Sequence, residues 1–406
     1  MSLWSSVSNL VSYALVALML AAAPALADKK YGPGVTDTEI KIGQTMPYSG
    51  PASAYATVGR AHAAYFEMIN AQGGINGRKI KLISLDDAMT PPKAVEQVRK
   101  LVEEEQVFIT FGILGISNFA VQKYLNANKV PQLFPSAASL RFHDPKTYPW
   151  TMGWVPSFDF EARIYARYLL ENRPNAKVAI LYLNDDLGKE YVHGFKAGLG
   201  DKAAKMVVAE ASYELTDSTV DSQIVQLQAS GADTLFTAAI PKFGSQTIRK
   251  VYDLGWKPFL LITYPGASVA ATLRPAGLEK AVGLVTAYFG KDLGALDAQA
   301  ATDPDVRDFL GWRKTYLPDA DPADGAYGYA YMQAALMVEV LKRCGNDLTR
   351  ENVMRQAANL HNVHIPMLLD GITVNTSPND FRPIKQMRML RFDGERWNYF
   401  GPMLTE

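Results

Sequence analysis

The sequence contains a single cysteine, Cys344, and this scarcity excludes one common way of stabilising a protein. One cysteine cannot form an intrachain disulfide, so the chain of 406 residues has to be held together by its core. Cys344 also lies far from the N-terminal segment, where a lipid-anchoring cysteine would be needed. We therefore expect a semi-buried thiol at the end of a helix rather than a metal ligand or a nucleophile.

An excess of charge of either sign is also missing. Lysine and arginine together number 41, as do aspartate and glutamate, so the formal net charge is zero. Binding to nucleic acid or to an anionic membrane surface is favoured by a positive field, which this composition does not supply globally. We therefore expect no nucleic-acid partner, although the composition is compatible with a local charged patch.

Catalytic signatures are absent as well: the sequence has no GxSxG elbow, no Walker loop, no HExxH and no GxGxxG. His361 and His364 are spaced as a potential metal pair, but no cysteine or clear carboxylate stands beside them. The acidic pairs Asp86-Asp87 and Asp185-Asp186 end apolar runs, where aspartate typically caps helices or braces loops. We predict that the protein is not an enzyme and has no metal site and no cofactor.

Long hydrophobic runs are limited to one, near the N-terminus. The run 10–23 is followed by Ala25-Leu26-Ala27, a small-x-small pattern, and the chain becomes polar at Asp28. The run is shorter than the roughly 20 residues that span a bilayer. We predict that residues 1–27 are a signal peptide, removed near Ala27, and that the protein is exported. A retained signal anchor is the alternative, because no lysine or arginine precedes the run.

The most informative stretch is 39–87, which reads as strand, polar loop, helix, tight turn and strand. Apolar residues alternate in its first strand and recur at three-to-four-residue spacing in its helix. The helix stops at Gly73-Gly74, where glycine permits a positive φ, and the second strand runs into Asp86-Asp87. This pattern predicts one βαβ unit of an open parallel sheet.

The residue sequence of this unit is more informative than its strand-helix-strand pattern: it reads IKIGQTMPYSGPASAYATVGRAHAAYFEMINAQGGINGRKIKLISLDD. It resembles the N-terminal lobe of the periplasmic branched-chain amino-acid-binding protein family, the solute-binding subunits of ABC importers. The resemblance extends more loosely from about Asp37 to the C-terminus. It implies the type I periplasmic-binding fold.

Strand and helix patterns alternate in both halves of the chain, which predicts two similar lobes. We expect an α/β protein with two doubly wound, Rossmann-like lobes joined by three hinge crossovers. Lobe I is predicted to contain residues 37–155 and 288–365, and lobe II residues 156–287 and 366–406. The dipeptide Asp393-Gly394 predicts a hairpin between the last two strands.

In the family that this chain resembles, lobe I holds the carboxylate of the solute with amides and hydroxyls from the loops after its third and fourth strands. These positions correspond to Gly115, Ile116, Ser117 and Asn118 in the first loop, and to Ser136, Ala137, Ala138 and Ser139 in the second. Tyr55 matches a family tyrosine that lines the cleft. The helix predicted to follow the first loop runs from Phe119 to Asn128.

Lobe II departs further from the family. Leu187 and Ile240 stand where amino-acid-binding members have tyrosines, and Tyr264 stands where they have the acid that pairs with the ligand's ammonium. Together with Phe243, these residues would make that wall apolar and aromatic. Because an unpaired buried ammonium is costly, we expect a carboxylate ligand without an α-ammonium, such as an aromatic acid. The alternative is that these four are core residues.

The leading interpretation is a periplasmic solute-binding subunit of an ABC importer. It would capture a small organic carboxylate or a branched-chain amino acid by lobe closure and deliver it to a permease in the inner membrane, acting as a monomer. Two other classes remain open at this point. One is a ligand-sensing receptor of the same fold, and the other is an α/β enzyme, which the missing motifs disfavour.

Overall fold

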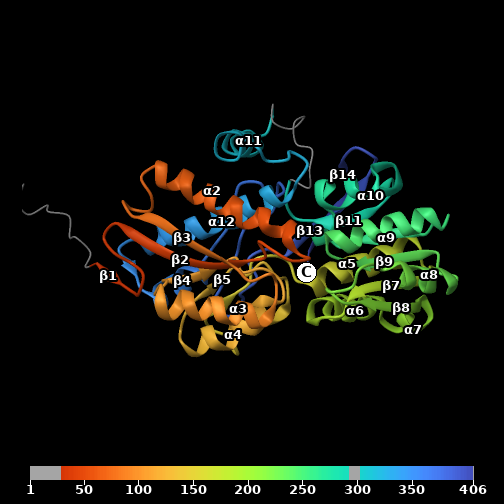
Figure 1. Ribbon diagram of the computed structural model, residues 1–406, viewed down its shortest axis with the longest axis horizontal. Coiled ribbons are helices and arrows are strands. Elements are labelled where there is room, and N and C mark those ends of the chain that lie inside the picture. The colour runs from red at the N-terminus through yellow and green to blue at the C-terminus, as the bar shows by residue number, and fades with distance from the viewer. Residues whose placement is uncertain (1–28, 292–301, 406) are drawn as a thin grey trace, which may run out of the picture.

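The computed structural model describes residues 29–291 and 302–405, and this part of the chain forms two lobes side by side (Figure 1). The predicted signal peptide lies outside the described residues. Within those ranges, no helix combines the length and the hydrophobicity needed to cross a bilayer. Each lobe is built on its own sheet.

The sheet of lobe I is parallel, with the strand order β3-β2-β4-β5-β6. Its strands are β2 (Glu39–Met46), β3 (Lys79–Asp86), β4 (Ile109–Phe111), β5 (Gln132–Leu133) and β6 (Thr151–Met152). In β2, Ile42 pairs with Leu82 on one side and with Ile109 on the other. β3, at the edge of the sheet, alternates apolar and polar residues, whereas β4, with a strand on either side, is buried throughout.

Helices cover both faces of this sheet, with α2 and α12 on one face and α3 and α4 on the other (Figure 1). The helices of lobe I are α2 (Ala56–Ala71), α3 (Pro91–Arg99), α4 (Ser117–Ala127), α11 (Pro304–Tyr316), α12 (Ala326–Cys344) and α13 (Arg350–Ala357). The helix α3 continues beyond Arg99 as a π-helical turn, η2 (Lys100–Glu104). Cys344 is the buried last residue of α12, where a helix-end thiol was expected.

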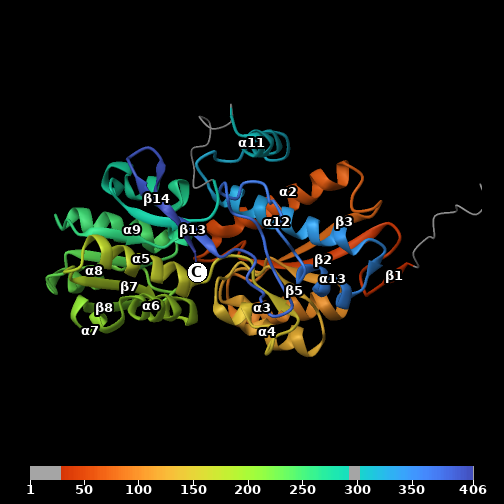
Figure 2. The ribbon, with the colours of Figure 1, turned by 180° about the vertical axis from the view of Figure 1, so that it is seen from behind.

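A small parallel sheet at the end of lobe I farthest from lobe II was not predicted (Figure 2). It joins β1 (Lys30–Tyr31) to β12 (Asp347–Leu348). Strands of two residues carry no measurable periodicity, so the pairing of segments this far apart leaves no signal in the sequence.

The sheet of lobe II has the order β14-β13-β11-β10-β9-β7-β8. Its strands are β7 (Val178–Leu183), β8 (Val207–Tyr213), β9 (Thr234–Ala238), β10 (Phe259–Ile262), β11 (Val285–Tyr288), β13 (Gln386–Phe392) and β14 (Trp397–Thr405). The predicted hairpin is confirmed: β13 and β14 pair antiparallel, and the carboxylate of Asp393 accepts hydrogen bonds from the amides of Glu395 and Arg396.

The helices of lobe II also cover both faces, with α5 and α6 packed together on one and α8 and α9 on the other. They are α5 (Phe158–Asn172), α6 (Asp186–Leu199), α7 (Ala203–Met206), α8 (Asp221–Ala229), α9 (Pro241–Asp253) and α10 (Arg274–Ala276). Short helical turns complete the described chain: η1 (Ser53–Tyr55), η3 (Leu140–His143), η4 (Gly200–Lys202), η5 (Tyr264–Gly266), η6 (Val269–Leu273) and η7 (Leu278–Ala281).

The chain passes between the lobes three times: from β6 to α5, from β11 to α11, and from α13 to β13. The predicted two-lobed α/β fold with three crossovers is confirmed. The domain boundaries stay a prediction. At the last crossover, Thr376 still donates a hydrogen bond to Ala357, and the carbonyl of Phe381 lies 2.8 Å from His143, so these contacts favour a boundary later than residue 365.

The start of α6 gives the first testable prediction. A Cβ on Gly188 would lie 1.9 Å from the carbonyl oxygen of Leu183, a backbone atom that cannot easily move away. We expect Gly188→Ala to lower the free energy of unfolding by roughly 3 kcal/mol in urea denaturation. Gly311→Ala in α11 is the control, because its Cβ would meet no atom within 4 Å and should add about 0.5–1 kcal/mol. Equal effects of the two substitutions would contradict the predicted clash.

Candidate ligand-binding site

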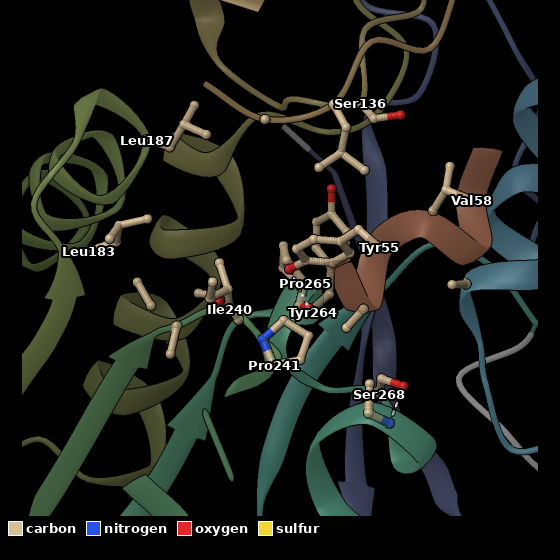
Figure 3. Close-up of a pocket in the computed structure, with 18 of the residues that line it drawn as sticks. Tyr55, Val58, Ser136, Leu183, Leu187, Ile240, Pro241, Tyr264, Pro265 and Ser268 are labelled. Carbon is tan, nitrogen blue, oxygen red and sulfur yellow. Dashed lines mark hydrogen bonds between the residues drawn. The ribbon is translucent and has the colours of Figure 1, made fainter. Parts of the chain in front are cut away.

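A cleft between the two lobes encloses about 1170 Å³ of space, part of it open to solvent. Figure 3 shows side chains of both lobes converging on it, with Tyr55 of lobe I reaching toward Pro265 and Tyr264 of lobe II. The lobe I wall is formed where β4 and β5 end, and the lobe II wall is formed at the ends of β7, β9 and β10. Open α/β sheets place their ligands at these carboxyl ends of strands.

Seven of the thirteen predicted site residues line this cleft. They are Tyr55, Gly115, Ile116, Ser136, Leu187, Ile240 and Tyr264. Leu187 belongs to the first turn of α6, Ile240 is the residue before α9, and Tyr264 opens the turn η5. Their common position on the walls is an observation, whereas their role in binding stays a prediction.

Five predicted residues of the lobe I loops do not line the cleft. They are the buried residues Ser117, Asn118, Ala137, Ala138 and Ser139. The helix α4 begins at Ser117, two residues earlier than predicted, so Ser117 and Asn118 belong to its first turn. The side-chain amide of Asn118 donates to the carbonyls of Ile113 and Gly115 at 2.7 and 3.0 Å, and so stabilises the loop from its buried side.

Phe243 also lies outside the cleft lining. The helix α9 begins at Pro241, so Phe243 lies in its first turn, and its side chain is buried in the core. There its ring packs against Tyr213, with the ring centroids 4.3 Å apart. The position of Phe243 therefore agrees with the alternative that it is a core residue.

The amide of Ile116 is an unused backbone donor on the lobe I wall. The amide of Gly115 donates to the carbonyl of Ser136 at 3.1 Å, whereas the amide of Ile116 has no acceptor in the described part of the chain. Ile116 is the N-terminal capping residue of α4, where amides point outward and the helix dipole favours an anion. The hydroxyl of Ser136 lies 2.9 Å from Nε2 of Gln333, which holds it in place.

Aromatic residues of the walls were missed by the sequence analysis. Phe158 and Tyr191 line the cleft and stack with ring centroids 4.5 Å apart, and Tyr288 and Tyr329 add two further rings. These residues lie within helices or strands whose periodicity indicates only burial. No local motif distinguishes a ring that faces the cleft from one that faces the core.

Two carboxylates line the cleft, and both cap helices. Asp185 accepts a hydrogen bond from the amide of Gly188 at 2.7 Å, and Asp324 accepts one from the amide of Ala326 at 3.0 Å. Burial raises the pKa of Asp185 to about 6 against the effect of the Gly188 amide, and burial also raises the pKa of Asp324. No lysine, arginine or histidine belongs to the described lining.

The other acidic and histidine motifs serve the scaffold. Asp86 accepts hydrogen bonds from Ser49 and from Lys93, which confirms a bracing role for its pair. His364 does have a carboxylate partner, Asp305 of α11, at 3.2 Å, which corrects the expectation that none lies nearby. Within residues 29–291 and 302–405, no group of three or more potential ligands could hold a metal ion.

The two lobes touch across the mouth of the cleft. The hydroxyl of Tyr55 donates to the carbonyl of Pro265 at 3.1 Å. Beside it, the amide of Ala270 in η6 donates to the carbonyl of Ala323 at 3.1 Å, and Arg274 forms an ion pair with Asp321. The structure therefore has its lobes in contact around the pocket.

Comparisons with known proteins agree with this geometry. A family model described as periplasmic binding protein matches residues 39–396. The Leu/Ile/Val-binding protein homolog 7 of Brucella suis biovar 1 is 22% identical over 346 residues, covering 82% of each chain. A branched-chain amino acid ABC transporter protein of Thermus thermophilus with bound valine matches with a TM-score of 0.81 at 15% identity, over 92% of this chain and 98% of that one. A solute-binding protein of Rhodopseudomonas palustris BisB5 in complex with 3,4-dihydroxybenzoic acid matches with a TM-score of 0.74 at 18% identity, over 90% and 97%.

The ion pair at the mouth can be tested without a ligand. Arg274→Glu places a negative charge against Asp321, so we expect the ligand-free protein to open and its radius of gyration in small-angle X-ray scattering to rise at low salt. An exposed pair contributes only about 0.2–1 kcal/mol, so the closed fraction should fall by up to about fivefold. Arg249→Glu, an exposed position on α9, is the charge-matched control. An equal rise in both variants would contradict a specific contact.

Proposed function

The chain belongs to the periplasmic binding protein family, and we propose that it captures an apolar carboxylate, foremost an aromatic acid, in the cleft. It would deliver this ligand to the permease of an ABC importer in the inner membrane, acting as a monomer. Family membership supports a periplasmic location, and the predicted signal peptide would supply the export. The ligand and the permease are the parts of this account that need testing.

The composition of the cleft is the observation that carries the proposal. Six rings surround the space: Tyr55, Phe158, Tyr191, Tyr264, Tyr288 and Tyr329. Aliphatic side chains, among them Leu187 and Ile240, fill the positions between them on lobe II. Such walls gain free energy by burying a flat apolar body, and ring pairs add about 0.5–1.5 kcal/mol beyond the buried area.

The acid group of the ligand would rest on lobe I. Without a lysine or arginine in the described lining, its charge has to be met by backbone amides and by the α4 dipole. The free amide of Ile116 is the donor best placed for this, with the loop at Ser136 beside it. Amides at a helix N-terminus are sufficient for a single carboxylate.

A branched-chain amino acid is the second candidate ligand, and the two carboxylates of the lining favour it. An ammonium would need Asp185 or Asp324 as its partner, because Leu187, Ile240 and Tyr264 cannot compensate its charge. Each of the two aspartates already caps a helix through one oxygen. This prior use is why we place the aromatic acid first.

A thermal-shift screen of residues 28–406 distinguishes the two ligands. We expect benzoate, 4-hydroxybenzoate or phenylacetate to raise the Tm, since a ligand at about a hundred times its Kd adds roughly 2.7 kcal/mol of stability. Benzamide and benzyl alcohol are the controls for the acid group and should have no effect. If leucine or valine raises the Tm and the aromatic acids do not, the amino-acid candidate replaces the aromatic one.

Tyr264 provides the matching test of the wall. Tyr264→Ala removes one ring from the cleft, and we expect the affinity for the best acid of the screen to fall about tenfold or more in titration calorimetry. Tyr252→Ala, at a tyrosine of α9 with 55% of its side chain exposed, is the control and should bind normally. Unchanged affinity in the Tyr264 variant, with its fold verified by circular dichroism, would remove this residue from the site.

A further inference from the structure

A carboxylate lies buried beneath the lobe II wall, and the proposed capture of a ligand does not use it. Glu161, in the first turn of α5, has an exposed fraction of 0%. Its hydrogen-bond partners in the described residues are all neutral groups. A buried charge without a cation is costly unless several donors surround it, so this arrangement calls for a reason.

Three donors from three elements converge on this carboxylate. Its Oε1 accepts from the hydroxyl of Tyr165 in α5 at 2.5 Å and from the backbone amide of Tyr264 in η5 at 2.8 Å. Its Oε2 accepts from the hydroxyl of Tyr191 in α6 at 2.5 Å. One side chain thus ties together α5, α6 and η5.

Two of these partners form the wall of the cleft. Tyr191 and Tyr264 both line it, and the residue after Tyr264, Pro265, accepts the hydrogen bond of Tyr55 from the other lobe. Because the hydroxyl hydrogen of Tyr191 is directed to Glu161, its ring presents an apolar face to the cleft. The position of the Glu161 carboxylate therefore affects both the lobe II wall and the hydrogen bond between Tyr55 and Pro265.

The third partner anchors the network in the sheet. The hydroxyl of Tyr165 accepts from the amide of Ala287 in β11 at 3.0 Å and lies 3.2 Å from the hydroxyl of Thr286. Its own hydrogen has two acceptors within reach, Oε1 of Glu161 at 2.5 Å and the carbonyl of Ile262 in β10 at 3.1 Å. The network thus links the cleft wall to the strands behind it.

We propose that Glu161 is a positioning residue for the ligand site: its carboxylate holds Tyr191 and the turn η5 where they complete the lobe II wall, and uptake of a proton by Glu161 loosens that wall. The link to binding rests on the proposed function. The link between Glu161 and the wall does not, because it can be measured in the ligand-free protein.

The proton balance explains why protonation matters. A neutral Glu161 carries a hydrogen that needs an acceptor, and because the amide of Tyr264 can only donate, this acceptor has to be the hydroxyl oxygen of Tyr165 or of Tyr191. The tyrosine that accepts has to turn its own hydrogen away from Glu161, and for Tyr165 the carbonyl of Ile262 at 3.1 Å is the alternative acceptor. Proton uptake therefore breaks one of the two tyrosine donations to Glu161.

The electrostatics place this event near neutral pH. Burial raises the pKa of Glu161 to about 7, against the opposing effect of the hydrogen bonds from Tyr165, Tyr191 and Tyr264. The titratable groups that face it are these three tyrosines from α5, α6 and η5, and burial raises the pKa of each well above the ordinary value, so they stay neutral in this range. From β11 only the uncharged Thr286 and the amide of Ala287 reach the network.

The test uses ligand-free mature protein labelled with ¹³C at tyrosine Cζ and followed by NMR from about pH 5.5 to about pH 8.5. We expect the signals of Tyr191 and Tyr264 to titrate with a midpoint near pH 7 and to be flat in Glu161→Gln. Tyr48 of lobe I is the internal control, because its hydroxyl lies 2.6 Å from the hydroxyl of Ser84 and takes no part in the network. A flat wild-type signal, or the same titration in the Glu161 variant, overturns the proposal.

Tyr191→Phe keeps the proposal testable if Glu161→Gln does not fold. The substitution removes a donor that stabilises the ionised form, so the midpoint read from Tyr264 should move to higher pH. A midpoint that stays in place or falls overturns the assignment of the titrating group to Glu161.

A second experiment, which measures ligand binding, distinguishes this inference from the proposed function. With benzoate as the probe, which stays ionised over this range, we expect wild-type affinity to be about fivefold weaker at pH 6 than at pH 8, and this weakening to be lost in Glu161→Gln. Protonation of Asp185, whose pKa burial raises to about 6, acts in the opposite direction in both proteins, because it removes a negative charge from the cleft. Failure of benzoate and of the other acids to bind wild type contradicts the proposed ligand class, and the tyrosine titration then still decides the role of Glu161. Benzoate binding that is independent of pH, alongside a titrating wall, overturns the coupling.

Discussion

The rings on the two walls of the cleft are apolar surfaces that water solvates poorly, and in this structure they lie between lobe I and lobe II. Each sheet has its own helical cover, and the buried core is continuous from one lobe to the other. The free energy of closing therefore depends on what occupies the space between Tyr55 on one side and Leu187, Ile240 and Tyr264 on the other. A ligand that touches both walls stabilises the closed arrangement by its differential contacts.

Several polar groups of the site form hydrogen bonds within the protein and not toward the cleft. The hydroxyl of Ser136 is held by Gln333, Asp185 and Asp324 cap helices, and the hydroxyl of Tyr191 is directed to Glu161. The hydroxyls of Ser136 and Tyr191 are thus engaged within the protein, and the amide of Ile116 is a donor open to an acid group. A wall with few unsatisfied donors selects ligands mainly by shape and apolar area.

Much of the fold could be predicted because local patterns and the global architecture agree. Alternating apolar runs mark the strands, and Asp393-Gly394 marks the hairpin. The site was harder to predict, because the start of a helix decides which way a side chain points. The family resemblance suggested Ser117, Asn118 and Phe243 for the site, but all three lie in the first turn of a helix, α4 or α9, and are buried. The hydrogen bonds of Glu161 join residues up to 103 positions apart and leave no local signal.

The central claim is that one apolar acid is enclosed between the two lobes. Nuclear Overhauser effects between the ring protons of the best-binding acid and the methyl groups of the protein test it most directly. The account predicts contacts from the same bound molecule to Leu187 and Ile240 of lobe II and to Ile116 of lobe I. Contacts to the methyl groups of one lobe alone, or to none of the three residues, would contradict it.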